Sequence, residues 1–93
     1  MTEEEFKEIL DAEETDTVEF KSWINARNMK EIISLAVDEL IAFANTKGGT
    51  VYFGVEDKTI EVTGCDRNYD GQRIIEGIYD RTVPPLFTEI SDF

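Results

Sequence analysis

AFANTKGGTVYFGVED, residues 42–57, decides the fold of this chain because three local signals agree within it. An apolar helix ends at Asn45, and the Gly48-Gly49 pair that follows suits a left-handed helix cap. The next run, Thr50–Val55, is rich in the β-branched and aromatic residues that strands prefer. The order of helix, tight turn and strand therefore predicts an α/β domain.

Helices are predicted on both sides of this stretch. The main helix begins after Asn28, a good N-cap with a glutamate three residues on, and carries a wide apolar stripe. Thr2 and Glu5 have the spacing of a capping box, which predicts a short helix over residues 2–11. Isoleucines at helical spacing predict a third helix over Gln72–Tyr79.

The remaining strand signals complete the expected architecture. Val18–Ser22 alternates apolar and polar residues, Thr59–Val62 reads as the antiparallel partner of Thr50–Val55, and Leu86–Ile90 reads as the start of another strand. We therefore expect an α/β (α+β) fold, with about three helices packed on a small mixed or antiparallel sheet. Residues 1–93 are expected to be a single domain, as the N-terminal fragment of a longer domain that has further C-terminal strands. The alternative is that a second copy covers the open sheet edge in a homo-oligomer.

Composition limits the chemistry that the chain can perform. The 93 residues include no histidine and one cysteine, Cys65, which excludes an internal disulfide, a Cys/His zinc site and a histidine base. No apolar run is long enough to span a bilayer, and the acidic N-terminus does not resemble a signal peptide. The expected compartment is the cytoplasm, with no membrane partner.

The formal charge of −12 is distributed unevenly along the chain. Residues 1–19 hold nine acids and one base, residues 20–58 hold five of each, and residues 59–93 hold seven acids and three bases. Because phosphate contacts dominate nucleic-acid affinity, only the central segment is suited to such contacts. The acidic N-terminal segment is interpreted as a solvated helix face that aids solubility.

Several short motifs together resemble the Schlafen-type AlbA-like domain. They are Glu14 followed by Glu19-Phe20-Lys21, the helix end and double glycine A-x-x-N-x-x-G-G at residues 42–49, G-V-x-D at residues 54–57, and Thr63-Gly64. The resemblance covers roughly residues 13–90. It implies a compact α/β domain with a nucleic-acid-related role, of the kind found in bacterial transcriptional regulators and also called a divergent ATPase-type domain.

The resemblance also implies a catalytic site. Vertebrate relatives use three carboxylates for RNA cleavage, which match Glu14, Glu19 and Asp57 here, and Lys21 matches the lysine after the second acid. Such carboxylates suit Mg²⁺ or Mn²⁺, and a bound ion would activate water toward a phosphodiester while the lysine neutralises developing charge. The competing interpretation is that all three are ordinary surface acids.

A nucleic-acid-binding surface is predicted around the basic residues of the central segment. Its members are an aromatic side chain that is able to stack on a base and the cations near it: Lys21, Trp23, Arg27, Lys30 and Lys47. The alternative for the tryptophan is a place in the core or in an interface.

A weaker prediction concerns phosphate binding by the turn that contains Asn45, Thr46, Gly48 and Gly49. The turn lacks the P-loop pattern and lies at the negative end of the helix dipole, so ATP is only weakly supported and a helix cap is favoured. Three functions thus stay open: a nucleic-acid-binding module, a metal-dependent nuclease, and an acidic protein-interaction or self-association domain.

Overall fold

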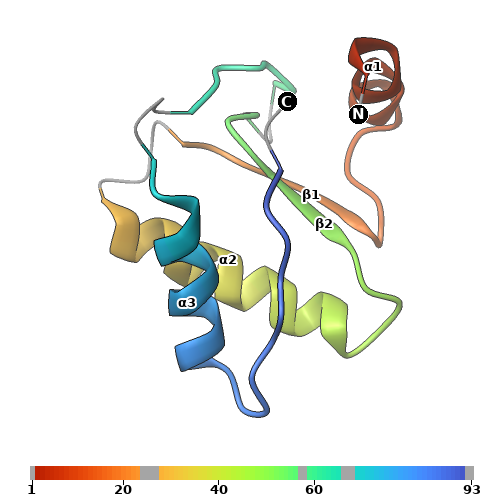
Figure 1. Ribbon diagram of the computed structural model, residues 1–93. Coiled ribbons are helices and arrows are strands. Elements are labelled where there is room, and N and C mark those ends of the chain that lie inside the picture. Colours follow the sequence, from red (N-terminus) through yellow and green to blue (C-terminus); the bar gives the residue numbers. More distant parts are fainter. Residues whose placement is uncertain (1, 24–27, 57–58, 66–68, 92–93) are drawn as a thin grey trace.

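The computed structural model describes residues 2–23, 28–56, 59–65 and 69–91. It confirms the predicted α/β class, with three helices and a two-stranded sheet in that part of the chain (Figure 1). No described helix is long and apolar enough to cross a membrane. In chain order the elements are α1 (Glu3–Ala12), β1 (Val18–Lys21), α2 (Met29–Ala44), β2 (Thr50–Phe53) and α3 (Gly71–Arg81).

Each helix begins at a side chain that accepts a hydrogen bond from the first turn. Thr2 accepts from the Glu5 N–H, Asn28 from the Glu31 N–H, and Asp70 from the Arg73 N–H. These bonds satisfy N–H groups that have no partner within the helix. The first two caps confirm the sequence prediction, and α3 extends the predicted Gln72–Tyr79 helix at both ends.

The two strands pair in parallel, and α2 is the crossover between them. Val18 lies beside Thr50, and Lys21 lies beside Phe53. The predicted antiparallel approach of Thr59–Val62 to residues 50–55 is found, but Thr59–Val62 does not form a strand. In the described ranges the contact between these segments is a single antiparallel bridge, Val55 to Val62. Two hydrogen bonds make this bridge, from the Thr63 N–H to the Gly54 carbonyl and from the Glu56 N–H to the Glu61 carbonyl. The pairing stays short because Gly54, with φ +90°, leaves the extended conformation directly after β2.

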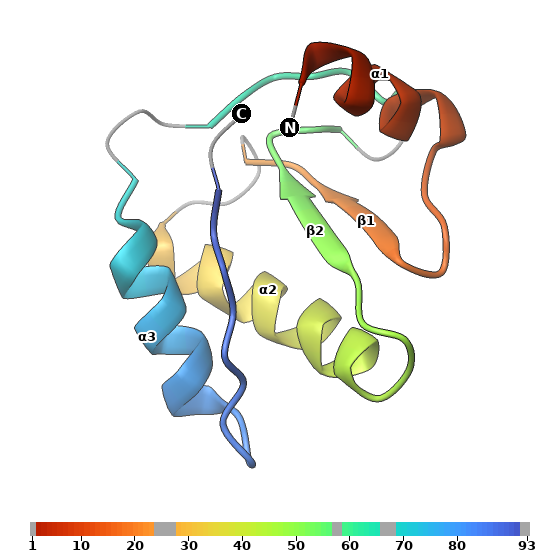
Figure 2. The same ribbon diagram turned by 45° about the vertical axis from the view of Figure 1, so that its right-hand side comes forward.

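Helices cover both faces of the sheet (Figures 1 and 2). Alternation along the strands directs Phe20 and Tyr52 toward α1, where Phe6 and Val55 complete one apolar cluster. Phe53 points the other way, into the larger core that α2 builds with α3. Phe20 is fully buried, so β1 has one register in which its apolar side chain is covered.

The segment after α3 runs back along that helix (Figure 2). The prediction of a strand at Leu86–Ile90 is wrong, because none of residues 82–91 belongs to a strand. Contacts of Leu86 and Phe87 hold the segment. The Leu86 N–H donates to the buried Thr82 hydroxyl at 2.7 Å, the Leu86 side chain packs on the larger core, and the Phe87 ring meets Tyr79 of α3 at a centroid distance of 5.4 Å. The residues that alternate as in a strand are thus used for packing against a helix.

The turn between α2 and β2 contains the predicted left-handed cap at Gly48, whose φ is +82° and whose N–H donates to the Phe43 carbonyl. At Gly49 the constraint is space. A Cβ there would lie 2.7 Å from the Phe43 ring and 2.8 Å from the Thr17 carbonyl oxygen. The turn is therefore as tight as the sequence predicts, with a different role for each glycine.

We expect Gly49→Ala to lower the free energy of unfolding by about 1–3 kcal/mol, since the added methyl group overpacks against backbone as well as ring. Gly48→Asn is the matched control. Asparagine tolerates a positive φ and Gly48 has open space, so this variant should lose less than about 0.5 kcal/mol. Urea denaturation of both variants measures the difference, and equal midpoints would contradict the close approach at Gly49.

Candidate functional site

The alternation of β1 places Glu19 and Lys21 on one face of the strand. Phe20 between them is buried toward α1, so its two neighbours point to the α2 side. Both charged side chains are largely shielded, with 24% and 22% of their surface exposed. The Glu-Phe-Lys motif therefore buries one aromatic side chain on the α1 side of the strand and places two opposite charges on the α2 side.

Lys21 is held by two carboxylates. Its Nζ lies 3.1 Å from Glu39 Oε1 on α2 and 3.6 Å from Glu19 Oε1. Burial by itself lowers the pKa of Lys21, but the hydrogen bond and charge of Glu39, together with those of Glu19, outweigh it and raise the pKa above its usual value. The lysine is thus a fixed cation that links the edge of the sheet to α2.

Glu39 is a site residue that the sequence analysis missed. It lies three residues after Ala36 and four before Phe43, and both of these are buried. An acid at the border of an apolar helix stripe was therefore the available signal. It was missed because the partner that explains it, Lys21, comes from another element.

The structure brings Glu14 and Glu19 together, as the motif spacing predicts. Residues 15 and 18 exchange backbone hydrogen bonds, which turns the loop after α1 back onto β1. Burial raises the pKa of Glu19, and the hydrogen bond and charge of Glu14 raise it further, against the smaller opposing effect of Lys21. The protonated form of Glu19 is therefore favoured in the folded chain more than in a free glutamate.

The third predicted carboxylate, Asp57, lies outside the described residues. Within residues 2–23, 28–56, 59–65 and 69–91, no three Asp, Glu, His or Cys side chains form a group suited to hold a metal ion. The neighbouring Glu56 was missed from the sequence. It accepts a hydrogen bond of 2.6 Å from the Ser22 hydroxyl, which joins the carboxyl ends of β1 and β2.

The predicted nucleic-acid-binding cations do not share one patch. Lys30 lies exposed in the first turn of α2 and Lys47 lies beyond its other end, so a helix of 16 residues, about 24 Å long, separates them. Lys47 makes an exposed ion pair with Asp16 at 3.0 Å. Lys21 is ion-paired as described above, and Arg27 lies outside the described residues. Whether these cations contact nucleic acid stays a prediction.

Trp23 follows β1 and is partly buried against the larger core. Its ring meets Phe53 edge to face at a centroid distance of 6.1 Å, and Tyr69 at 5.8 Å. This environment favours the core interpretation over an open stacking platform. The single cysteine is close by: the Cys65 thiol donates to the Phe53 carbonyl at 3.3 Å.

The turn predicted as a weak phosphate loop uses its polar groups internally. The N–H groups of Asn45, Thr46 and Gly48 donate to the carbonyls at the end of α2, and the Thr46 hydroxyl does the same. Gly49 is crowded by Phe43 and Thr17. These bonds support the helix-cap interpretation of the turn.

Comparison with known protein families gives a match over most of the chain. The family model described as Schlafen, AlbA_2 matches residues 14–93. The match contains both strands, α2 and α3, together with Glu14, Glu19, Lys21 and Glu39, whereas α1 lies before it. No solved structure matches the chain.

The carboxylate pair makes a prediction about stability and pH. Because the pKa of Glu19 is raised above its ordinary value of 4.5, the folded chain favours the protonated form. The contribution of this group to stability is fully present below pH 4.5 and is lost as the pH rises through the folded pKa. We expect Glu19→Gln to raise the free energy of unfolding at pH 7 by about 1 kcal/mol or less, with the gain disappearing toward pH 4.

Glu39→Gln is the control for this measurement. It removes the nearer partner of Lys21 and relieves no carboxylate repulsion, so it should lower the urea midpoint at pH 7. A Glu19→Gln midpoint that falls at pH 7 in the same way would show that the pair with Lys21 outweighs the repulsion from Glu14.

Proposed function

The chain belongs to the Schlafen AlbA_2 family, and on that premise we propose that it is a nucleic-acid-binding module that serves a transcriptional regulator. The observation that carries this proposal is the family match over residues 14–93, which takes in the sheet, the helices α2 and α3 and the charged residues on β1. The family match supports a nucleic-acid-related role in general. Our proposal adds that this chain binds DNA or RNA and takes part in regulating transcription.

Charge decides where such contact is favourable. Residues 1–19 carry a net charge of −8 and repel phosphate, whereas residues 20–58 are neutral overall and include the exposed Lys30 and Lys47. The proposed binding surface therefore follows α2, on the side of the sheet away from α1. An affinity that depends on few cations in an acidic protein is expected to be weak and sensitive to salt.

We expect Lys30→Gln and Lys47→Gln each to weaken binding of a fluorescein-labelled single-stranded RNA or DNA. Each should also lower the slope of log affinity against log salt by about 0.7 for every phosphate that the protein no longer neutralises. The matched control is Lys7→Gln, which removes the same charge from the exposed surface of α1. Fluorescence anisotropy between about 20 and 150 mM salt gives both quantities. Equal weakening by all three variants would reject α2 as the binding surface.

A second candidate function is cleavage of a phosphodiester, and the contact between Glu14 and Glu19 is the observation that favours it. Divalent ions such as Mg²⁺ are often held by one or two carboxylates together with substrate phosphates, so this pair fits such an ion even without a third ligand. A bound Mg²⁺ or Mn²⁺ would polarise the phosphodiester and lower the pKa of an attacking water.

The residues of this chain have distinct proposed roles in that reaction. Glu14 and Glu19 would hold the ion as carboxylates, while Lys21, fixed by Glu39, would balance charge on the phosphate. Asp57 remains the proposed third ligand, on the basis of the family motif.

We expect Glu19→Gln to abolish Mn²⁺-dependent cleavage of labelled single-stranded RNA while leaving binding in EDTA unchanged within about twofold. Asp80→Asn, which removes an exposed acid from α3, is the control and should cleave like the parent chain. Gel electrophoresis of the products with Mn²⁺ and with EDTA tests this. Cleavage that persists in Glu19→Gln, or in EDTA, would reject the carboxylate site and leave the binding function untouched.

A further inference from the structure

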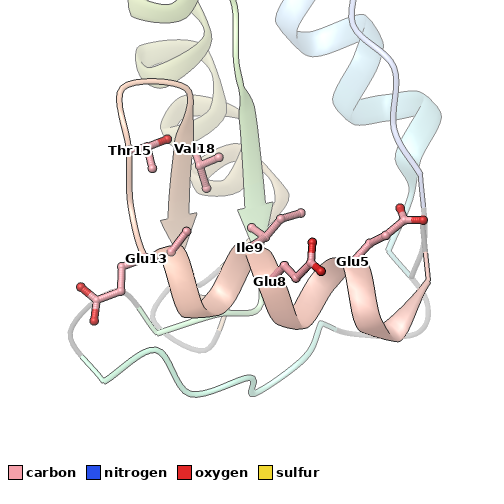
Figure 3. Close-up of a pocket in the computed structure, with 7 residues that line it drawn as sticks. Glu5, Glu8, Ile9, Glu13, Thr15 and Val18 are labelled. Carbon is pink, nitrogen blue, oxygen red and sulfur yellow. The ribbon is translucent and has the colours of Figure 1, made fainter.

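A groove lies between α1 and the loop that leads into β1, on the side of the sheet away from α2 (Figure 3). Its floor is apolar, formed by Ile9 and Ala12 of α1 and by Val18 of β1. Ile9 and Val18 also pack on the Phe20 cluster, so the floor is the outer surface of a rigid core. The groove is therefore a formed feature of the domain, separate from the lysines of α2.

The rim of the groove is acidic. Glu5 and Glu8 stand along α1, and Glu13 stands at its C-terminal end (Figure 3). All three are exposed. Across the described ranges, the ion pairs are those of Lys21 with Glu19 and Glu39 and of Lys47 with Asp16, so no described cation neutralises this rim. Its negative charge is available to a molecule from outside.

We propose that this groove, the α1 groove, binds a basic segment of a partner protein. A Lys or Arg side chain joins an aliphatic stem to a cationic head, which matches an apolar floor with a carboxylate rim. A phosphate-bearing ligand does not match, because residues 1–19 carry a net charge of −8. Charge complementarity therefore selects a cationic peptide as the occupant.

The position of the groove makes this interaction independent of the nucleic-acid function. The lining residues on α1, together with Glu13, lie before residue 14 and so outside the family match. Figure 2 shows α1 and α2 on opposite sides of the two strands. A chain that binds a basic partner on α1 and nucleic acid along α2 keeps the two ligands on opposite sides of the sheet. The partner is then free to bind whether or not nucleic acid is present.

The test uses the full chain and a fluorescein-labelled peptide, Leu-Lys-Leu-Arg-Leu-Lys, in fluorescence anisotropy at about 50 mM salt. We expect Glu8→Gln to weaken binding about two- to fivefold, the effect of one exposed ion pair. Glu4→Gln is the matched control: it removes the same charge from an exposed position on α1 that does not line the groove, and it should change affinity less than about twofold.

Shape is tested separately from charge. Ala12→Leu fills the floor without altering any charge, and we expect at least about a tenfold loss of peptide affinity with an unchanged circular dichroism spectrum. Equal losses from Glu8→Gln and Glu4→Gln would show diffuse attraction to an acidic protein and overturn the proposal. So would binding of single-stranded RNA that Ala12→Leu abolishes, since the groove would then hold nucleic acid. If Ala12→Leu fails to fold, the glutamate pair still decides.

Discussion

The parallel pairing of β1 with β2 is the constraint on which the rest of the structure depends. Two parallel strands need a crossover, and α2 supplies it, so the helix is obliged to lie across one face of the sheet. Full burial of Phe20 on the other face fixes the register of β1. In that register, the alternation of side chains along β1 directs Glu19 and Lys21 toward α2. The position of the charged site therefore follows from the packing of Phe20.

Electrostatics at the site is a balance between carboxylates in excess and one fixed cation. Lys21 pairs with Glu39 and with Glu19, but burial of Glu19, together with the hydrogen bond and charge of Glu14, raises the pKa of Glu19 more than Lys21 lowers it. A site of this composition accepts a further cation more readily than a bare phosphate. Under the proposed cleavage function, this preference favours a phosphate that carries a metal ion over direct contact with phosphate.

Local signals in the sequence predicted the local structure well. The caps at Thr2 and Asn28, the stripe of α2 and the turn at Gly48 are each specified by residues close together in the sequence, and each was found where the pattern placed it.

The pairing of segments far apart in the sequence was harder to predict. Thr59–Val62 has strand-like residues next to β2 in sequence, yet the strand that pairs with β2 is β1, from the other side of the crossover helix. No local pattern predicts this choice of partner. Leu86–Ile90 was misjudged because a segment packed on a helix also alternates. In the candidate site, the sequence predicted that Glu14 and Glu19 come together, whereas the contacts of Glu39 and Glu56 depend on the packing of separate elements.

The length of α2 sets a distance scale on the surface of the molecule. Lys30 and Lys47 stand at its two ends, about 24 Å apart for 16 residues of helix. Each base pair of a duplex advances about 3.4 Å along the duplex axis, so the helix is as long as about seven base-pair steps. The proposed binding surface thus has a defined length: a nucleic acid shorter than the helix would contact one of the two lysines, and only a longer one would contact both.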